Sequence, residues 1–175
     1  MACEFLLAFP FAFLFFLAAA EFGLLLTNLR HVELAAFESA REVARLDKQH
    51  LGDAAQLARR RANRALQTAG TGQTCLVVVE HNVPDAGNGF QVNADKDCGI
   101  AGGPRRPLPS VGRVRAVRCT VAVRMRHLAP DLLAMVGFSL KDRKAYATVT
   151  VPYVGDCRPK QKSGKEPKVA QTQSN

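Results

Sequence analysis

Five cysteines and four histidines give this 175-residue chain its widest range of possible chemistry. Cys75, Cys98, Cys119 and Cys157 lie far apart in a Gly- and Pro-punctuated segment, whereas Cys3 stands alone near the N-terminus and is expected to be unpaired. No two of them have the close spacing of common zinc sites. Wide spacing in a small domain is typical of disulfides formed in an oxidising compartment. We therefore expect Cys75–Cys98 and Cys119–Cys157 bridges, each closing a moderate loop, with buried free thiols or metal binding as the alternatives.

The histidines form no recognisable catalytic pattern. None belongs to a zinc-protease helix motif or follows a nucleophile elbow, and the Gly-rich pieces lack the Lys-Ser/Thr ending of a phosphate loop. We expect solvated or interfacial histidines, no enzymatic activity and no cofactor. The residues concerned are His31, His50, His81 and His127.

Basic side chains exceed acidic ones by 24 to 15, a formal net charge of +9. Regularly spaced Arg on a strand indicates a solvated face, and the alternative is an electrostatic surface for an acidic polymer, lipid headgroups or nucleic acid. Nucleic acid is disfavoured because aromatic stacking partners are nearly absent after the N-terminal segment. The candidates are Arg105, Arg106, Arg113, Arg115, Arg118, Arg124 and Arg126.

The N-terminal part of the chain is dominated by one long apolar run. Phe5–Leu26 holds seven of the ten Phe and one ionisable side chain, Glu21. A run of about 20 residues is long enough to cross a ~30 Å hydrocarbon core, which disfavours a soluble cytosolic enzyme. A cleaved signal peptide would need a basic n-region and a shorter run, and a buried core helix is the other alternative. We expect residues 1–26 to span a membrane, with Glu4 and Glu21 near its two interfaces and Pro10 tolerated inside it.

A polar helical pattern follows the apolar run. Apolar residues recur at three- and four-residue steps, and charges of both signs occupy the other face. Gly70–Gly72 ends the pattern, and Gly52 is its one weak point. We expect an amphipathic helix over 27–69 that continues the membrane helix, giving one rod of up to about 95 Å from residue 5 to residue 69.

Beyond Gly72 the pattern changes to a period of two, which is typical of β-strands. Residues 70–157 are expected to form a small, disulfide-bonded antiparallel sheet, and 158–175 a disordered basic tail. A long N-terminal helix whose second half packs on this sheet is an α+β architecture. The strands are expected at Thr74–Glu80, Phe90–Val92, Val114–Arg126 and Ala145–Val154.

Two signals conflict over the compartment of the sheet domain. Arg30, Arg41 and Arg45 follow the span and no basic residue precedes it, which places the domain in the cytoplasm by the positive-inside rule. The spaced cysteines favour an oxidising compartment, and long domains are exported largely regardless of their charge. We give the cysteines more weight and expect a single-pass protein with an extracytoplasmic domain.

The N-terminal part carries two acidic-aromatic motifs. Glu4–Pro10 (Glu-Phe-Leu-Leu-Ala-Phe-Pro) opens the apolar run, Glu21-Phe22-Gly23 follows, and the polar helix contains Ala40–Arg45 (Ala-Arg-Glu-Val-Ala-Arg). Over about residues 4–46, roughly a quarter of the chain, this pattern resembles the TadE-like (TadE/TadG) family of pilus assembly proteins. Those proteins are pseudopilins, minor components of tight-adherence (Flp-type) pili.

The resemblance implies a pilin-like fold and a non-enzymatic role in pilus assembly at a bacterial inner membrane, with other pilin subunits and the assembly machinery as partners. It also implies that a prepilin peptidase cuts after a Gly, so that an acidic residue becomes the fifth of the mature chain and registers the subunit against its neighbours. Glu4 matches that residue. No Gly or basic leader precedes it here, as expected of an internal start codon or a nearly mature form.

A second function fits the same residues without a pilus. The chain would then be a membrane-anchored extracytoplasmic binding module that uses its Arg-rich face on an acidic polymer.

Overall fold

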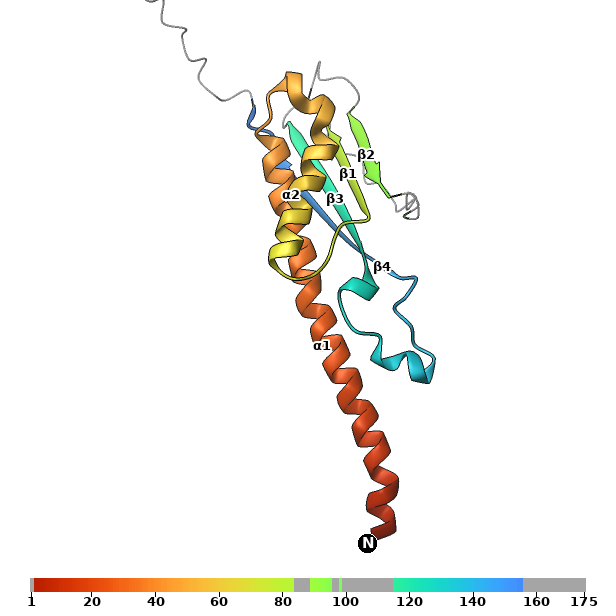
Figure 1. The fold of residues 1–175 in the computed structure, drawn as a ribbon. Helices are drawn as coiled ribbons and strands as arrows, with labels where there is room; N and C mark the ends of the chain where they lie inside the picture. The colour runs from red at the N-terminus through yellow and green to blue at the C-terminus, as the bar shows by residue number, and fades with distance from the viewer. Residues whose placement is uncertain (1, 84–88, 96–97, 99–114, 156–175) are drawn as a thin grey trace, which may run out of the picture.

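The structure, a computed structural model, describes residues 2–83, 89–95, 98 and 115–155, with the backbone alone for residues 2–7 and Val136. Cys157 and the expected tail at 158–175 lie outside the described residues. One long helix and a shorter helix that turns back along it cover a four-stranded antiparallel sheet (Figure 1). This arrangement confirms the expected α+β class. The elements are α1 (Ala2–Ala44), η1 (Lys48–Asp53), α2 (Ala54–Thr68), β1 (Leu76–His81), β2 (Phe90–Ala94), β3 (Ala116–Arg124), η2 (Met125–His127), η3 (Leu132–Val136) and β4 (Lys144–Pro152).

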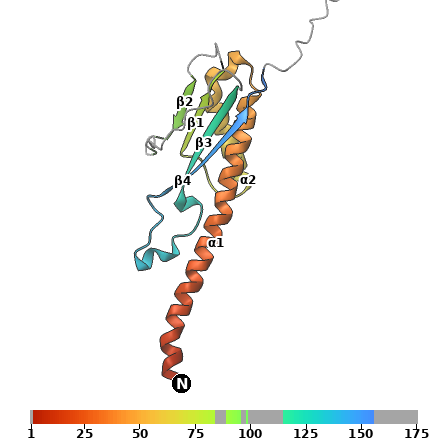
Figure 2. The ribbon, with the colours of Figure 1, turned by 180° about the vertical axis from the view of Figure 1, so that it is seen from behind.

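Helix α1 has two halves with different surroundings. Its 43 residues extend about 64 Å, and the first half projects beyond the rest of the chain in both ribbon views (Figures 1 and 2). The second half buries residues at three- and four-residue steps, as an amphipathic helix does on a protein core. These residues are Val32, Ala35, Ala36, Ala40, Val43 and Ala44.

The expected continuous helix from residue 5 to residue 69 is wrong, because α1 ends at Ala44 and the chain turns back. The backbone N–H groups of Arg45 and Leu46 bond three residues back, which tightens the last turn, and Asp47 is extended. Gly52, the weak point in the helical pattern, lies in η1 within this turn. Two antiparallel helices with apolar stripes have the same periodicity as one long helix, so the pattern alone does not distinguish them.

Small residues hold the hairpin together. Ala58 and Ala62 of α2 are completely buried, as are Ala36 and Ala40 of α1. The Ser39 hydroxyl lies 2.7 Å from the Ala35 carbonyl of its own helix and 3.0 Å from the Ala58 carbonyl of α2. An Arg61–Glu38 ion pair at 2.7 Å links the exposed rim of the two helices. Helix α2 ends as expected before Gly70 and Gly72, which both have positive φ.

The sheet has the strand order β2-β1-β3-β4, with every neighbouring pair antiparallel. Helix α1 lies over β3 and β4, and α2 lies over β1 and β2. Strand β3 confirms the expected alternation, since its apolar residues face the helices while Arg118, Thr120 and Arg124 lie on the other face. The helix-facing residues are Val117, Cys119, Val121 and Val123, all completely buried.

A second, smaller core lies on the outer face of the sheet. It contains Leu76, Val78, Ala122 and the two cysteines Cys75 and Cys98. Ala122, expected on the solvated face of its strand, is completely buried here. The disulfide therefore lies in a small apolar cluster on the face of the sheet that α1 and α2 do not cover.

The end of β4 completes the end of α1. The Val154 N–H donates to the Ala44 carbonyl at 2.8 Å, and the Tyr153 hydroxyl donates to the Leu46 carbonyl at 2.6 Å. These carbonyls belong to the last turn of α1 and the residues after it, where no intrahelical donor is available. Gly155 lies so close that a Cβ at this position would be 2.0 Å from the Leu46 oxygen.

We predict that Tyr153→Phe lowers the free energy of unfolding by about 1 kcal/mol, because it removes one hydrogen bond and leaves the Leu46 carbonyl without its donor. Urea denaturation of the full chain in detergent measures this change. Tyr146, the other tyrosine of the chain, is 46 % exposed, so Tyr146→Phe serves as the matched control and should leave the midpoint unchanged. Equal midpoints for all three proteins would contradict the role of Tyr153.

Candidate membrane and assembly surface

The first half of α1 exposes a ring of aromatic side chains. Five Phe between residues 9 and 16 are exposed by 52 % to 78 %, and the rings of Phe9 and Phe13 stack at 6.4 Å. Soluble monomers rarely expose such a large apolar patch. By length and composition, this part of α1 is able to cross a membrane. The other three of these five side chains are Phe11, Phe15 and Phe16.

The residues expected at the start of the span lie on this helix. The backbone of Glu4 and Phe5 is helical, while their side chains lie outside the described residues. Pro10 lies inside α1, and the helix continues through it. Proline removes one donor and displaces one carbonyl, so neighbours in the membrane must satisfy the freed carbonyl.

Glu21, expected near a membrane interface, is buried against another part of the chain. Its side chain is 1 % exposed, and its Oε2 accepts a hydrogen bond from the Leu133 backbone N–H at 2.8 Å. Its Oε1 has no hydrogen-bond partner among the described residues. Leu133 belongs to η3, so a residue in the apolar run binds a segment more than a hundred positions away. The sequence contains no signal for this contact because it joins two segments that no local pattern connects.

Phe22 and Gly23 have unequal roles beside Glu21. The Phe22 ring packs against the Phe138 ring, with 5.9 Å between centroids. Gly23 has open space where a Cβ would stand, and its carbonyl accepts the Thr27 hydroxyl at 2.9 Å. Phe22 therefore contributes to the attachment of the segment before β4, whereas Gly23 leaves the helix surface open.

A groove lies between α1 and the edge strand β4. It has a volume of about 490 Å³, and its walls include Leu34 and Phe37 of α1, which are 53 % and 43 % exposed, and Tyr146 of β4. No strand among the described residues pairs with the outer edge of β4. Exposed apolar side chains beside an open edge are typical of a surface that another polypeptide covers.

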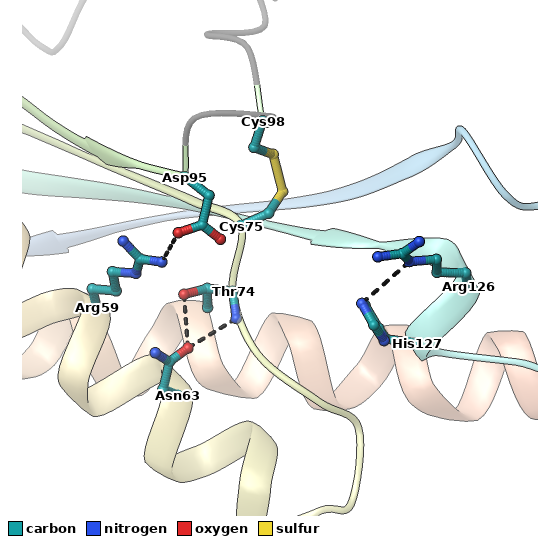
Figure 3. The surroundings of a disulfide bond; sticks show 8 residues. All are labelled: Arg59, Asn63, Thr74, Cys75, Asp95, Cys98, Arg126 and His127. Carbon is teal, nitrogen blue, oxygen red and sulfur yellow. Dashed lines mark hydrogen bonds and ion pairs between the residues drawn. A yellow bond between two sulfur atoms is a disulfide. The ribbon is translucent and has the colours of Figure 1, made fainter.

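One of the two expected disulfides forms. Cys75 and Cys98 form a disulfide with 5.7 Å between their Cα atoms (Figure 3). The expected Cys119–Cys157 bridge is not present, because Cys119 is a free thiol in the centre of the helix-facing core. Its strand position turns the side chain under the helices, and the burial raises the pKa of the thiol to about 12.

Two polar contacts brace the neighbourhood of the disulfide. The Asn63 Oδ1 atom accepts hydrogen bonds from the Thr74 N–H at 2.8 Å and from the Thr74 hydroxyl at 2.7 Å (Figure 3). Arg59 of α2 forms an ion pair with Asp95, just after β2. Both contacts connect α2 to residues next to the disulfide. They hold the backbone on each side of the Cys75–Cys98 bridge in place.

The structure divides the expected basic surface. Arg105, Arg106 and Arg113 lie outside the described residues. Arg118 is largely buried and forms an ion pair with Glu80 at 3.3 Å, so its charge is balanced within the sheet. Arg115 is exposed at the start of β3.

Arg124 and Arg126 lie at the other end of β3. They line a pocket of about 340 Å³ together with Lys141, Arg143 and Lys144, with Asp142 as the one carboxylate of the lining. Five basic groups around one acid make this the place where the predicted basic character is concentrated among the described residues.

The histidines occupy scattered positions. His50 and His127 are exposed and His31 is half-buried, while His81 is buried at the end of β1, contrary to the expected solvated position. No group of three or more His, Cys, Asp or Glu close enough to hold a metal occurs in the parts of the chain that the structure describes.

We predict that Cys119 resists alkylation at pH 8 in the native protein and reacts after denaturation in urea. The thiolate is the nucleophile in alkylation. With a pKa of about 12, the buried Cys119 thiol forms almost no thiolate at pH 8 in the native protein. Peptide mass spectrometry without reduction measures the modification, with the linked Cys75–Cys98 peptide as the internal control. Recovery of Cys119 linked to Cys157, or modified in the native protein, would show that this assignment is wrong.

We predict that Glu21→Leu speeds exchange of the Leu133 amide hydrogen about ten- to a hundredfold, because a buried N–H without its acceptor costs about 1 to 3 kcal/mol. Glu21→Gln should change the rate much less, since its amide oxygen still accepts the bond. Hydrogen exchange followed by mass spectrometry of the full chain measures both rates. Thr27→Ala, on the same helix but bonded only within it, is the control; unaltered exchange in Glu21→Leu would contradict the contact.

Comparison of the chain with family models, curated proteins and solved structures found no match. The interpretation of this surface therefore depends on its geometry and on the motifs in the sequence.

Proposed function

We propose that the protein is a non-enzymatic, single-pass minor pilin or pseudopilin of the TadE-like type, which takes part in assembling a tight-adherence pilus at a bacterial inner membrane. The observation that carries the proposal is the division of α1. Its apolar residues 8–16 are exposed, and its second half packs into the core of an α+β domain. The Glu-Phe motifs at Glu4 and Glu21 add the resemblance on which the pilus assignment depends.

Such a subunit would assemble laterally. Free apolar helices pack against one another in lipid through van der Waals contacts, and the Pro10 region would obtain its missing backbone partners there. Above the membrane, the groove between α1 and β4 offers Leu34 and Phe37 to a neighbouring subunit. In this proposal the disulfide-bonded domain lies outside the cytoplasm. The Cys75–Cys98 bridge supports that side of the membrane, because disulfides persist in oxidising compartments.

A cleavage experiment tests the proposal. The gene with its upstream codons is expressed with and without the matching prepilin peptidase. A pilin-like chain yields a shortened product only when the peptidase is present. A chain of unchanged length in both cultures would contradict the proposal and favour a membrane-anchored binding module.

We predict that Glu4→Gln leaves membrane insertion and the Cys75–Cys98 bridge normal but abolishes co-purification with the pilus or its assembly complex. The carboxylate would pair with a cationic group of a neighbour in a low-dielectric setting, where a lost partner costs several kcal/mol. Asp53→Asn is the control, because Asp53 is exposed in the turn between α1 and α2 and its side chain makes no capping hydrogen bond. Glu21 does not serve as a control because it binds Leu133. Normal co-purification of the Glu4 variant would leave Glu4 without a registration role.

A further inference from the structure

The segment between β3 and β4, residues 125–143, reaches from the sheet toward the first half of α1 (Figures 1 and 2). We call it the β3–β4 segment. Its Leu133 N–H bonds Glu21, and its Leu128 carbonyl accepts the Asn28 side-chain amide. These contacts fix the height of the segment along the helix.

That height lies within the apolar run. Glu21 precedes Arg30, the first basic residue on the helix, by nine positions, or about 13 Å along the axis. Phe22, Leu24 and Leu26 lie between them and are exposed on the helix surface. When α1 spans a membrane, η3 therefore lies at the level of the interface and not in bulk water.

The tip of the β3–β4 segment exposes an apolar side chain at this level. Met135 is 93 % exposed, and Ala134 beside it is also exposed. Gly137 has a φ of 90° and ends η3 with a backbone bond to Ala134 at 3.1 Å, followed by a bond from Phe138 to Leu133. A defined turn thus presents Met135 outward. In water this exposure has no benefit, whereas among acyl chains and headgroups it buries apolar area.

The basic pocket is joined to the same level. The Arg143 guanidinium lies 5.0 Å from the centre of the Phe138 ring, and that ring packs on Phe22 of the apolar run. No carboxylate of the described residues lies within ion-pair distance of Lys141, Arg143 or Lys144. The pKa of His127 is lowered by burial and then by Arg126 and Arg124, which agrees with a cationic field at this end of the sheet.

We infer that the β3–β4 segment is a second membrane contact, in which Met135 enters the interfacial layer and the basic pocket binds the phosphates of anionic lipid headgroups. The pocket is lined by Arg124, Arg126, Lys141, Arg143 and Lys144. Phosphate is the ligand because several closely spaced cations suit its multiple oxygens. Lipid is its source because Arg143 of the pocket contacts Phe138, and Phe138 packs on Phe22 of the apolar run, so the pocket adjoins the level of the apolar tip. This contact does not require a pilus and depends only on insertion of α1.

The absence of tryptophan from the chain provides a clean reporter. Met135→Trp is reconstituted as the full chain in nanodiscs of phosphatidylcholine, with or without phosphatidylglycerol, using lipids brominated in the upper acyl chain. We expect the Met135→Trp fluorescence to be quenched in both kinds of nanodisc, because the contacts with α1 set the height of the segment. Quenching should be stronger in the anionic nanodiscs, where the pocket binds the headgroups. Gln49→Trp, in the turn beyond α1 and exposed, should remain unquenched in both.

Charge variants in the Met135→Trp background test the pocket. Combined Lys141→Gln, Arg143→Gln and Lys144→Gln should reduce quenching in anionic nanodiscs to the neutral level. Combined Arg41→Gln, Arg45→Gln and Arg60→Gln removes the same charge from exposed positions on the helices and should have no effect. A high concentration of potassium chloride should cause the same decrease in quenching when the pocket carries its native residues. This measurement keeps the test valid if the triple variant of Lys141, Arg143 and Lys144 folds poorly.

The outcomes separate this contact from the anchor. Phe13→Trp reports insertion of α1, so unquenched fluorescence from this variant would overturn the membrane anchor and with it this inference. Quenching by lipid in Phe13→Trp, combined with quenching by aqueous iodide in Met135→Trp, would overturn the second contact alone. Inorganic phosphate that reduces lipid quenching more than chloride of equal ionic strength would assign the pocket to free phosphate and contradict the lipid assignment.

Discussion

The structure depends on one helix that must satisfy two environments. The first half of α1 exposes Phe and Leu on all sides, while the second half buries Val32, Ala36, Ala40 and Val43 without a gap in the helix between them. Continuous backbone hydrogen bonds carry the direction of the first half into the second. The orientation of the sheet relative to the apolar half of the helix is therefore set by which face of α1 carries the small apolar residues.

The other elements follow from this constraint. Small residues on α1 allow α2 to return at close range, and α2 covers the half of the sheet that α1 leaves open. Tyr153 and Val154 close the upper end of α1, and the β3–β4 segment binds its middle through Leu133 and Leu128.

The sequence was sufficient for the parts of the fold that depend on local patterns. Alternation along β3 and β4 placed Cys119, Val121 and Ala147 on the covered face, and the composition of residues 5–26 indicated the free apolar helix. The turn after Ala44 was missed because two packed helices repeat the period of one. The bond between Glu21 and Leu133 joins residues 112 positions apart, and the choice between a Cys119–Cys157 bridge and a free Cys119 thiol also depends on distant parts of the chain. For these contacts neither spacing nor composition carries a signal.

Helix α1 changes its surroundings at about Glu21, and spin labels placed singly along residues 9–43 measure this change directly. The labels are read in nanodiscs, in a chain lacking Cys3 and Cys157, with oxygen and a water-soluble nickel complex as the two relaxing agents. Labels at 9–16 should all contact oxygen and exclude nickel, whereas beyond Asn28 access to nickel should rise and fall with the 3.6-residue period of a helix on a protein core. Nickel access throughout 9–16, or the same periodic protection in both halves, would contradict the account.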